Sequence, residues 1–279
     1  MVAREEAAAA EPGFGAQEMV AGGVGLGGGS AKPIALAAVI LLWQAVGFLN
    51  GWLHFYNPKL FPDPLDIVVS AWRLAQQGVL WTDIWVSTLR VVEGVVASAP
   101  PGIVLGMLVG RVRRVEDTVE PVIELLRPIP PLALLPMIIL WFGIGEASKV
   151  FFIAYSCFFV IFTTVVVGVR NIDPVLLRAG ESLGLSRWQL YRFVIMQAVM
   201  PDIMLGLRLG LSVGFLVIVA AEFIAADTGL GYLINYSRTW FRVGDMMVGA
   251  ITIGVLGVGS NYLLLALERR LFRWRASSS

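Results

Sequence analysis

The stretch VFFIAYSCFFVIFTTVVVGV, residues 150–169, contains no charged residue and is long enough to cross a membrane as one helix. A hydrocarbon core of about 30 Å is crossed at about 1.5 Å per residue, so a spanning helix needs about 20 mostly apolar residues. Five further stretches meet this criterion: Ile34–Leu53, Ile84–Gly110, Asp117–Phe142, Ile203–Ala226 and Met246–Ala266. The sequence therefore predicts an all-α polytopic membrane protein with about six transmembrane helices.

The composition argues against the main soluble classes. Of the 279 residues, 57% are hydrophobic and 15% are charged, whereas soluble domains have about 45–50% apolar and about 25% charged residues. The 21 basic and 20 acidic residues nearly cancel, so an electrostatic nucleic-acid binder is not expected. The chain has one cysteine and one histidine, too few for a Cys- or His-based metal site.

Lysine and arginine residues orient the predicted spans, because positively charged loops stay on the cytoplasmic side. One side of the predicted topology carries fourteen of these residues and the other carries six, so both termini are expected in the cytoplasm. Residues 1–31 hold eight glycines and no apolar run, which predicts a disordered cytoplasmic tail. Residues 32–275 form the predicted transmembrane domain, and residues 276–279 form a short C-terminal tail.

Two local patterns concern packing. Asp63 and Pro64 are suited to the N-cap and first position of a short amphipathic helix, which we expect to lie in the outer membrane interface. Small residues recur every four positions in two predicted spans, where they allow another helix backbone to approach closely. We favour static packing inside one bundle over a moving or dimerising interface. These residues are Gly94, Ser98, Gly102, Gly106, Gly110, Gly206, Gly210 and Gly214.

The longest cytoplasmic segment, residues 171–200, does not look like a membrane span. Asp173 and Pro174 predict a helix start, and Gly184 can take the left-handed conformation that ends a helix. Ser186 and Gln189 have the spacing of a capping box, so a second helix should run to about Met200. The segment is thus expected to form a helix–glycine–helix elbow with Leu183 and Leu185 near its tip. Such a tip suits a groove in another protein, with an elbow lying on the bilayer as the alternative.

The elbow resembles the EAA loop of the permease subunits of ABC importers. The stretch RAGESLGLSRW, residues 178–188, has the glycine of that loop at Gly184. It departs from the pattern at Arg178, at Gly180 and at Gln197, where a glutamate, an alanine and a proline are usual. Other stretches resemble the same family, which extends the similarity over about residues 35–275, and the nitrate, sulfonate and taurine branch is the most similar. These stretches are RPIPPL at 127–132, WFGIGE at 141–146, GLRLG at 206–210, AAEFI at 220–224 and GLG at 229–231.

The resemblance implies a type I ABC importer permease in a bacterial inner membrane, with the elbow as the coupling helix. The implied partners are two ABC ATPase subunits, a second copy of this chain, a periplasmic or lipid-anchored substrate-binding protein and the lipid bilayer. None of the three lysines lies in a G-K-[ST] sequence, so we expect no enzyme activity and no cofactor in this chain. ATP and Mg²⁺ would bind the partner ATPase. The implied coupling residues are Arg178, Ala179, Gly180, Glu181, Ser182, Leu183, Gly184, Leu185 and Ser186.

The resemblance also implies a class of substrate. Taurine or another alkanesulfonate is the first choice, and nitrate, bicarbonate, an aromatic acid or a vitamin precursor are the alternatives. A membrane-embedded enzyme or a channel is a more remote interpretation.

Ionisable residues inside predicted spans are candidates for the translocation path, because burying them in a membrane is costly. Arg127 precedes a proline cluster at Pro128, Pro130 and Pro131, and such broken backbone is tolerated where it lines a cavity. The alternative for Arg127 is an ion pair with Glu124, since Glu120, Glu124 and Arg127 share one helix face. Glu222 lies near the outer end of its span, where it could line a gate. Its alternative is a structural ion pair with Arg238 or Arg242.

Overall fold

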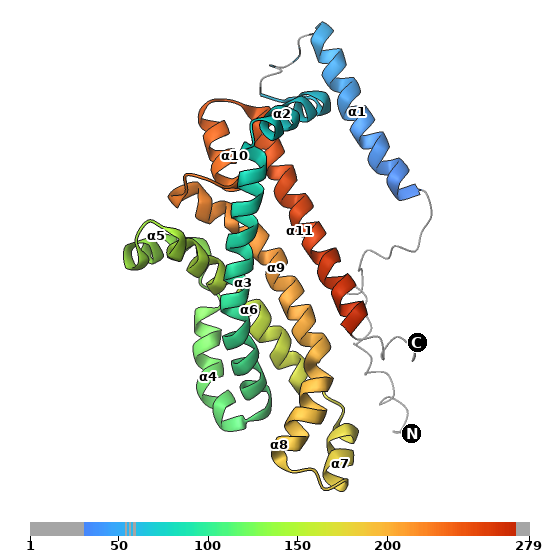
Figure 1. The fold of residues 1–279 in the computed structure, drawn as a ribbon, viewed down its shortest axis with the longest axis vertical. Helices are drawn as coiled ribbons and strands as arrows, with labels where there is room; N and C mark the ends of the chain where they lie inside the picture. The colour runs from blue at the N-terminus through green and yellow to red at the C-terminus, as the bar shows by residue number, and fades with distance from the viewer. Residues whose placement is uncertain (1–30, 54, 56, 58–59, 272–279) are drawn as a thin grey trace, which may run out of the picture. The chain divides into compact units, whose positions relative to one another are not determined.

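The computed structural model describes residues 31–271 except 54, 56, 58 and 59. The predicted C-terminal tail, 276–279, lies outside the described residues, as does the predicted N-terminal tail, 1–31, except for its last residue, Ala31, which begins a helix. All regular structure in the described part is helical. Helix α1, Ala31–Leu53, falls in one compact unit of the chain, and everything from residue 54 onward forms a second. The second unit contains α2 Pro64–Gln76, α3 Val79–Arg111, α4 Arg113–Leu126, α5 Pro131–Phe142, α6 Glu146–Arg170, α7 Pro174–Ser182, α8 Arg187–Leu190, the π-helical turn η1 Tyr191–Ile195, α9 Met196–Ala225, α10 Leu230–Thr239 and α11 Val243–Leu271 (Figure 1).

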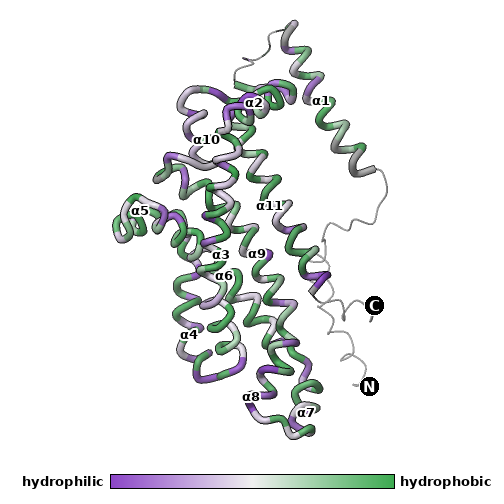
Figure 2. The backbone as a smooth tube through the Cα atoms, in the orientation of Figure 1, coloured by the Kyte–Doolittle hydropathy of each residue, from purple (hydrophilic) through white to green (hydrophobic). Residues whose placement is uncertain are grey.

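Three long helices, α3, α6 and α9, pack side by side as the centre of the second unit, and α11 packs against α9 and α10. Figure 2 shows hydrophobic residues along these helices and hydrophilic ones gathered toward their ends. Many large apolar side chains point away from the bundle, including Leu216, which is 75% exposed, and Val255, which is 64% exposed. An apolar outer surface of this kind is expected where lipid, not water, surrounds a protein.

The small residues of α3 let α6 approach closely. A Cβ atom added to Gly94 would lie 2.5 Å from Cγ2 of Ile153, and one added to Gly110 would lie 2.7 Å from Cβ of Val169. Gly102 and Gly106 face Ile161 and Val165 of α6 in the same way. The prediction of packing inside one bundle is therefore confirmed for this stripe, because its partner helix belongs to the same chain.

The predicted span Asp117–Phe142 is wrong as one continuous helix. It is split into α4 and α5, which are bent by 96° at a break over residues 127–130. Proline lacks the backbone N–H of a helical hydrogen bond and fixes φ, so Pro128 and Pro130 end one helix and Pro131 begins the next. The carbonyl oxygen of Leu126, freed at the break, accepts from the backbone N–H of Ile129 at 3.2 Å and from Tyr155 Oη at 3.3 Å.

The count of spanning helices also differs from the expected six. In the part of the chain that the structure describes, four helices are long and apolar enough to cross a membrane, or five if the bent α4–α5 pair counts as one span. The apolar part of α1, Ala37–Asn50, is shorter than these. The second limb of the elbow does not end near Met200, because helical structure continues from Arg187 to Ile224 through Pro201.

The predicted amphipathic helix is confirmed as α2. The side chain of Asp63 accepts a hydrogen bond from the backbone N–H of Asp66 at 2.8 Å, and Pro64 occupies the first helical position. Ile67 and Leu74 are buried, whereas Val68 is exposed. A salt bridge from Arg73 of α2 to the buried carboxylate of Asp245 joins this helix to the start of α11.

Candidate coupling elbow and buried ion-pair network

The first limb of the elbow has the helix signals that the sequence predicts. Asp173 Oδ1 accepts a hydrogen bond from the backbone N–H of Val175 at 2.8 Å and so caps α7. The helix ends in a Schellman motif, with Gly184 at φ +72°, its N–H bonded to the carbonyl of Glu181 and the N–H of Leu185 bonded to the carbonyl of Gly180. Open space surrounds Gly184, so its left-handed backbone is the reason for glycine at this position.

The second limb begins with a reciprocal capping box. The side chain of Ser186 accepts from the backbone N–H of Gln189 at 3.3 Å, and Gln189 Oε1 accepts from the backbone N–H of Ser186 at 2.9 Å. These short-range bonds fix the turn between the limbs without help from the membrane-spanning helices.

The inside of the elbow explains the departure at Gly180. Gly180 is buried, and a Cβ atom there would lie 2.5 Å from Cδ1 of Leu190 on the second limb. Leu185 also approaches Gly180, at 3.5 Å from the same Cβ position, and is only half-buried. Leucines from the turn and the second limb therefore occupy the space that a side chain at 180 would need.

Two large apolar side chains are exposed on the outside of the elbow. Leu183 is 80% exposed at the turn, and Trp188 is 68% exposed at the start of the second limb. Leu183 and Leu185 both lie near the turn, as predicted, but only Leu183 is exposed, since Leu185 is half-buried and approaches Gly180. An exposed leucine and tryptophan on a tightly capped turn form a preorganised apolar surface.

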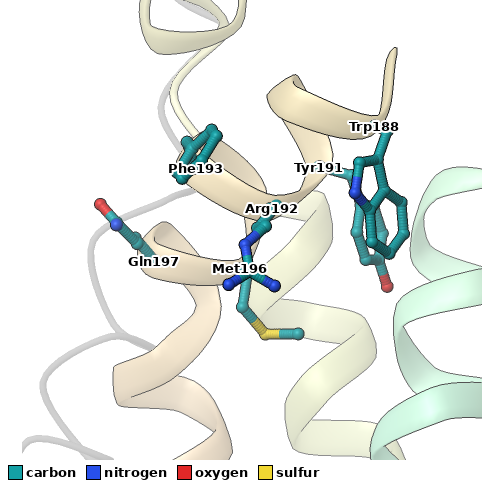
Figure 3. Close-up of a pocket in the computed structure, with 6 residues that line it drawn as sticks. All are labelled: Trp188, Tyr191, Arg192, Phe193, Met196 and Gln197. Carbon is teal, nitrogen blue, oxygen red and sulfur yellow. The ribbon is translucent and has the colours of Figure 1, made fainter. Parts of the chain in front are cut away.

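A cavity of about 340 Å³ lies beside the second limb, where α8 passes into the π-helical turn (Figure 3). The rings of Trp188 and Tyr191 stack at 6.2 Å with an interplanar angle of 14°. Tyr191 Oη donates a hydrogen bond to Sδ of Met107 on α3 at 3.4 Å. This contact ties the elbow to the central bundle. The cavity is lined by Trp188, Tyr191, Arg192, Phe193, Met196 and Gln197.

The predicted path residues around Arg127 lie at the break between α4 and α5. Arg127 is exposed, as are Pro128 and Pro130, and Pro131 is half-buried. Within the described ranges Arg127 and Glu124 form no ion pair, so the predicted pair is wrong. Glu120, which shares their predicted face, instead accepts a hydrogen bond from Arg170 of α6 at 3.0 Å.

Glu222, the other predicted path residue, is completely buried at the end of the bundle away from the elbow. The prediction of a pair with Arg238 or Arg242 is wrong: Glu222 Oε1 accepts from Arg90 Nη1 at 2.7 Å. Arg238 instead donates to Asn235 Oδ1 at 3.0 Å. Arg90 lies inside α3, as the predicted span Ile84–Gly110 implies, although the helix begins earlier than predicted, at Val79.

Arg90 is the centre of a larger set, which we call the Arg90 network: Asp83, Ser87, Arg90, Glu146 and Glu222. Arg90 binds Glu146 in bidentate fashion, from Nε at 2.6 Å and from Nη2 at 2.7 Å. Its Nη1 also donates to the carbonyl of Thr228 at 2.7 Å, and Lys149 Nζ donates to Glu146 at 2.9 Å. Two carboxylates and a carbonyl thus balance one buried guanidinium, as a low-dielectric site requires.

The Arg90 network also holds the start of α10. The backbone N–H groups of Gly229, Leu230 and Gly231 bind Asp83 Oδ1 at 2.8 Å, Ser87 Oγ at 2.8 Å and Glu222 Oε2 at 2.7 Å, in that order. No side chain at the N-cap position performs this task, because that residue is Gly229. Unpaired N–H groups at a helix start carry partial positive charge, which these carboxylates offset.

Sequence reasoning found Glu222 and missed the rest of the Arg90 network. Asp83, Ser87 and Arg90 lie at i, i+4 and i+7 in a mostly apolar helix, which is a signal for one polar face. Their partners come from α6, α9 and α10, and nothing in the local sequence identifies them.

The fold and the elbow together define a multi-pass helical membrane protein with a preformed turn at one end of its bundle. The chain belongs to the family described as "binding-protein-dependent transport system inner membrane component", whose sequence profile matches residues 102–274. It is therefore an ABC importer permease and not an enzyme, and it works with an ATP-hydrolysing subunit and a substrate-binding protein.

Individual relatives match nearly the whole chain. It is 34% identical to the taurine transport system permease protein TauC of Escherichia coli (strain K12), over 86% of this chain and 87% of the relative. It is 33% identical to the putative aliphatic sulfonates transport permease protein SsuC of Bacillus subtilis (strain 168), over 88% of each. It is also 32% identical to the riboflavin transport system permease protein RibX of Chloroflexus aurantiacus, over 88% of this chain and 90% of the relative.

Proposed function

We propose that this chain forms the membrane path of an importer for taurine or another alkanesulfonate. The names of the taurine and aliphatic sulfonate relatives support this substrate class, since each is matched over more than four-fifths of both chains. Riboflavin is the second candidate, because the riboflavin permease is matched over a similar length at nearly the same identity.

The observation that carries the coupling role is the geometry of the elbow. Leu183 projects from a turn that is capped on both limbs, so it can enter a groove of an ATPase subunit without further ordering of the chain. In the proposed complex, two copies of this chain bind two ATPase subunits, which hold ATP and Mg²⁺. Both termini and the elbow would face the cytoplasm, as the lysine and arginine distribution favours.

Within the membrane, we place Arg127 and the prolines at 128, 130 and 131 on the translocation path. The backbone there is broken and Arg127 is exposed without an ion partner in the described ranges, which suits attraction of an anion. Glu222 would contribute at the outer end of the path through the Arg90 network, not as a ligand for the anion, since a carboxylate repels a sulfonate.

Purification of the tagged chain from its native membrane in gentle detergent tests this proposal. Mass spectrometry should identify a P-loop ATPase near one-to-one with the chain, together with a substrate-binding protein. Calorimetric titration of that binding protein with taurine, ethanesulfonate, nitrate and riboflavin should give tight binding of a sulfonate. Tight binding of riboflavin alone would replace the sulfonate proposal with the second candidate, and a chain that purifies without an ATPase would contradict the coupling role.

A further inference from the structure

One continuous helical segment joins the elbow to the Arg90 network. It runs from Arg187, on the second limb of the elbow, to Ile224, and contains Glu222 in its last turn. The ends of this segment therefore lie at the elbow and at the Arg90 network. A displacement of the elbow along this helix would also move Glu222.

At the far end, the contacts of Glu222 leave little room for such a displacement. A Cβ atom added to Gly231 would lie 2.8 Å from Cβ of Glu222. On the neighbouring face, a Cβ atom added to Gly214 of α9 would lie 2.8 Å from Cγ1 of Val91, the residue after Arg90. Hydrogen bonds also depend steeply on distance and angle, so a small shift of α9 would break the bonds from Arg90 and Gly231 to Glu222.

We propose that the Arg90 network is a latch that keeps the bundle end opposite the elbow closed, with Arg90 and Glu222 as positioning residues of the transport cycle. Movement of α9, driven through the elbow, separates Glu222 from Arg90 and releases the start of α10 with the loop before it. This inference rests on the proposed function, because it assumes that the elbow is moved by a partner subunit.

Two observations favour a latch over a merely stabilising contact. A buried ion pair can often be replaced by apolar side chains without loss of stability, so its presence is weak evidence for a stabilising role. The Arg90 network also reaches from the interior to the surface, since the side chain of Glu146 is 60% exposed while that of Arg90 is 4% exposed. Water can therefore reach the charges when the helices separate, which lowers the cost of opening.

A cysteine accessibility experiment on the complete complex in nanodiscs tests the latch. Ala221, next to Glu222, is fully buried, so Ala221→Cys places a thiol that a water-soluble maleimide should reach only when this end opens. The native Cys157 is the chain's one cysteine and is also fully buried, in the packing of α6 against α9. Labelling of Cys157 therefore measures general loosening of the bundle in the same sample.

In the absence of nucleotide, Glu222→Gln should raise the labelling rate of Cys at 221 at least about tenfold while Cys157 stays unlabelled, because Gln keeps the shape but removes the charge that pairs with Arg90. Glu222→Asp, which keeps the charge, should label more slowly than Glu222→Gln. The matched control is Glu120→Gln, which removes a partner of the exposed Arg170 near the elbow and should leave labelling at 221 unchanged.

ATP with vanadate should raise labelling at 221 in the complex that retains Glu222. Unchanged labelling in Glu222→Gln would overturn the latch, and so would equal labelling of Cys157, which would make the contact a general stabiliser. If Glu222→Gln behaves as expected while the nucleotide has no effect, the latch stands and the coupling role of the elbow fails. The two proposals can thus fail separately.

Discussion

Replacing Leu183 by glutamate should separate docking of the ATPase from folding of the permease. Leu183 is 80% exposed, so the free permease should lose no more than about 0.5 kcal/mol of stability. A leucine that becomes fully buried in a partner groove contributes about 1.5–3 kcal/mol. A glutamate forced into the same groove adds about 1–3 kcal/mol for an unsatisfied polar group, more if it stays charged. The sum is about 2.5–6 kcal/mol, which is at least about a 60-fold loss of affinity.

The assay is titration of the purified ATPase subunit onto the permease in nanodiscs, read by biolayer interferometry. Leu183→Ala should weaken binding by about tenfold, because it loses most of the apolar contribution without adding a charge. Thr118→Glu is the matched control, since it adds the same charge to an exposed position outside the elbow, on α4. Equal affinity of Leu183→Glu and the unmodified chain would refute the docking argument, and equal weakening by Thr118→Glu would attribute the effect to charge alone.

Three further changes test other parts of the structure. Gly94→Ala should cost about 1–3 kcal/mol of stability and lower the thermal unfolding midpoint, because its Cβ would lie 2.5 Å from Ile153 Cγ2. Gly259→Ala is the control, because open space surrounds Gly259, and it should leave the midpoint unchanged. Equal midpoints for the two variants would contradict the close α3–α6 contact. Arg127→Ala should lower sulfonate uptake by proteoliposomes about tenfold without reducing the yield of assembled complex, and full uptake would remove Arg127 from the path. Gly184→Val should make the elbow more sensitive to limited proteolysis, because the left-handed backbone conformation costs a residue with a Cβ about 1–2 kcal/mol of stability. Unchanged cleavage would contradict the need for a left-handed residue at position 184.

The elbow could be predicted almost completely because each of its signals is local. Caps at Asp173 and Ser186 and the left-handed Gly184 act over a few residues, and all three are present in the structure. Even there, the sequence did not distinguish the exposed Leu183 from the half-buried Leu185. Its inward position depends on the absence of a side chain at Gly180, which is a contact between two parts of the elbow.

Features that depend on distant helices could not be predicted. Hydropathy alone joined Asp117–Phe142 into one span, although the prolines at 128, 130 and 131 already indicated a break that the bend of 96° realises. Glu222 was recognised as unusual, but its partner Arg90 lies on a helix far away in sequence. An arginine near the end of a predicted span is also easily interpreted as a loop residue, so a buried arginine at that position is not recognised from the sequence.

The Arg90 network joins residues that are made at different times during synthesis of the chain. When α3 enters the membrane during synthesis, Arg90 has no partner until Glu146 and then Glu222 arrive on later helices. The acceptors for the N–H groups at the start of α10, in contrast, lie on Asp83, Ser87 and Glu222, which are all made before α10 itself. A chain interrupted between residues 146 and 222 would therefore hold Arg90 with one of its two carboxylate partners, Glu146, and without the other, Glu222.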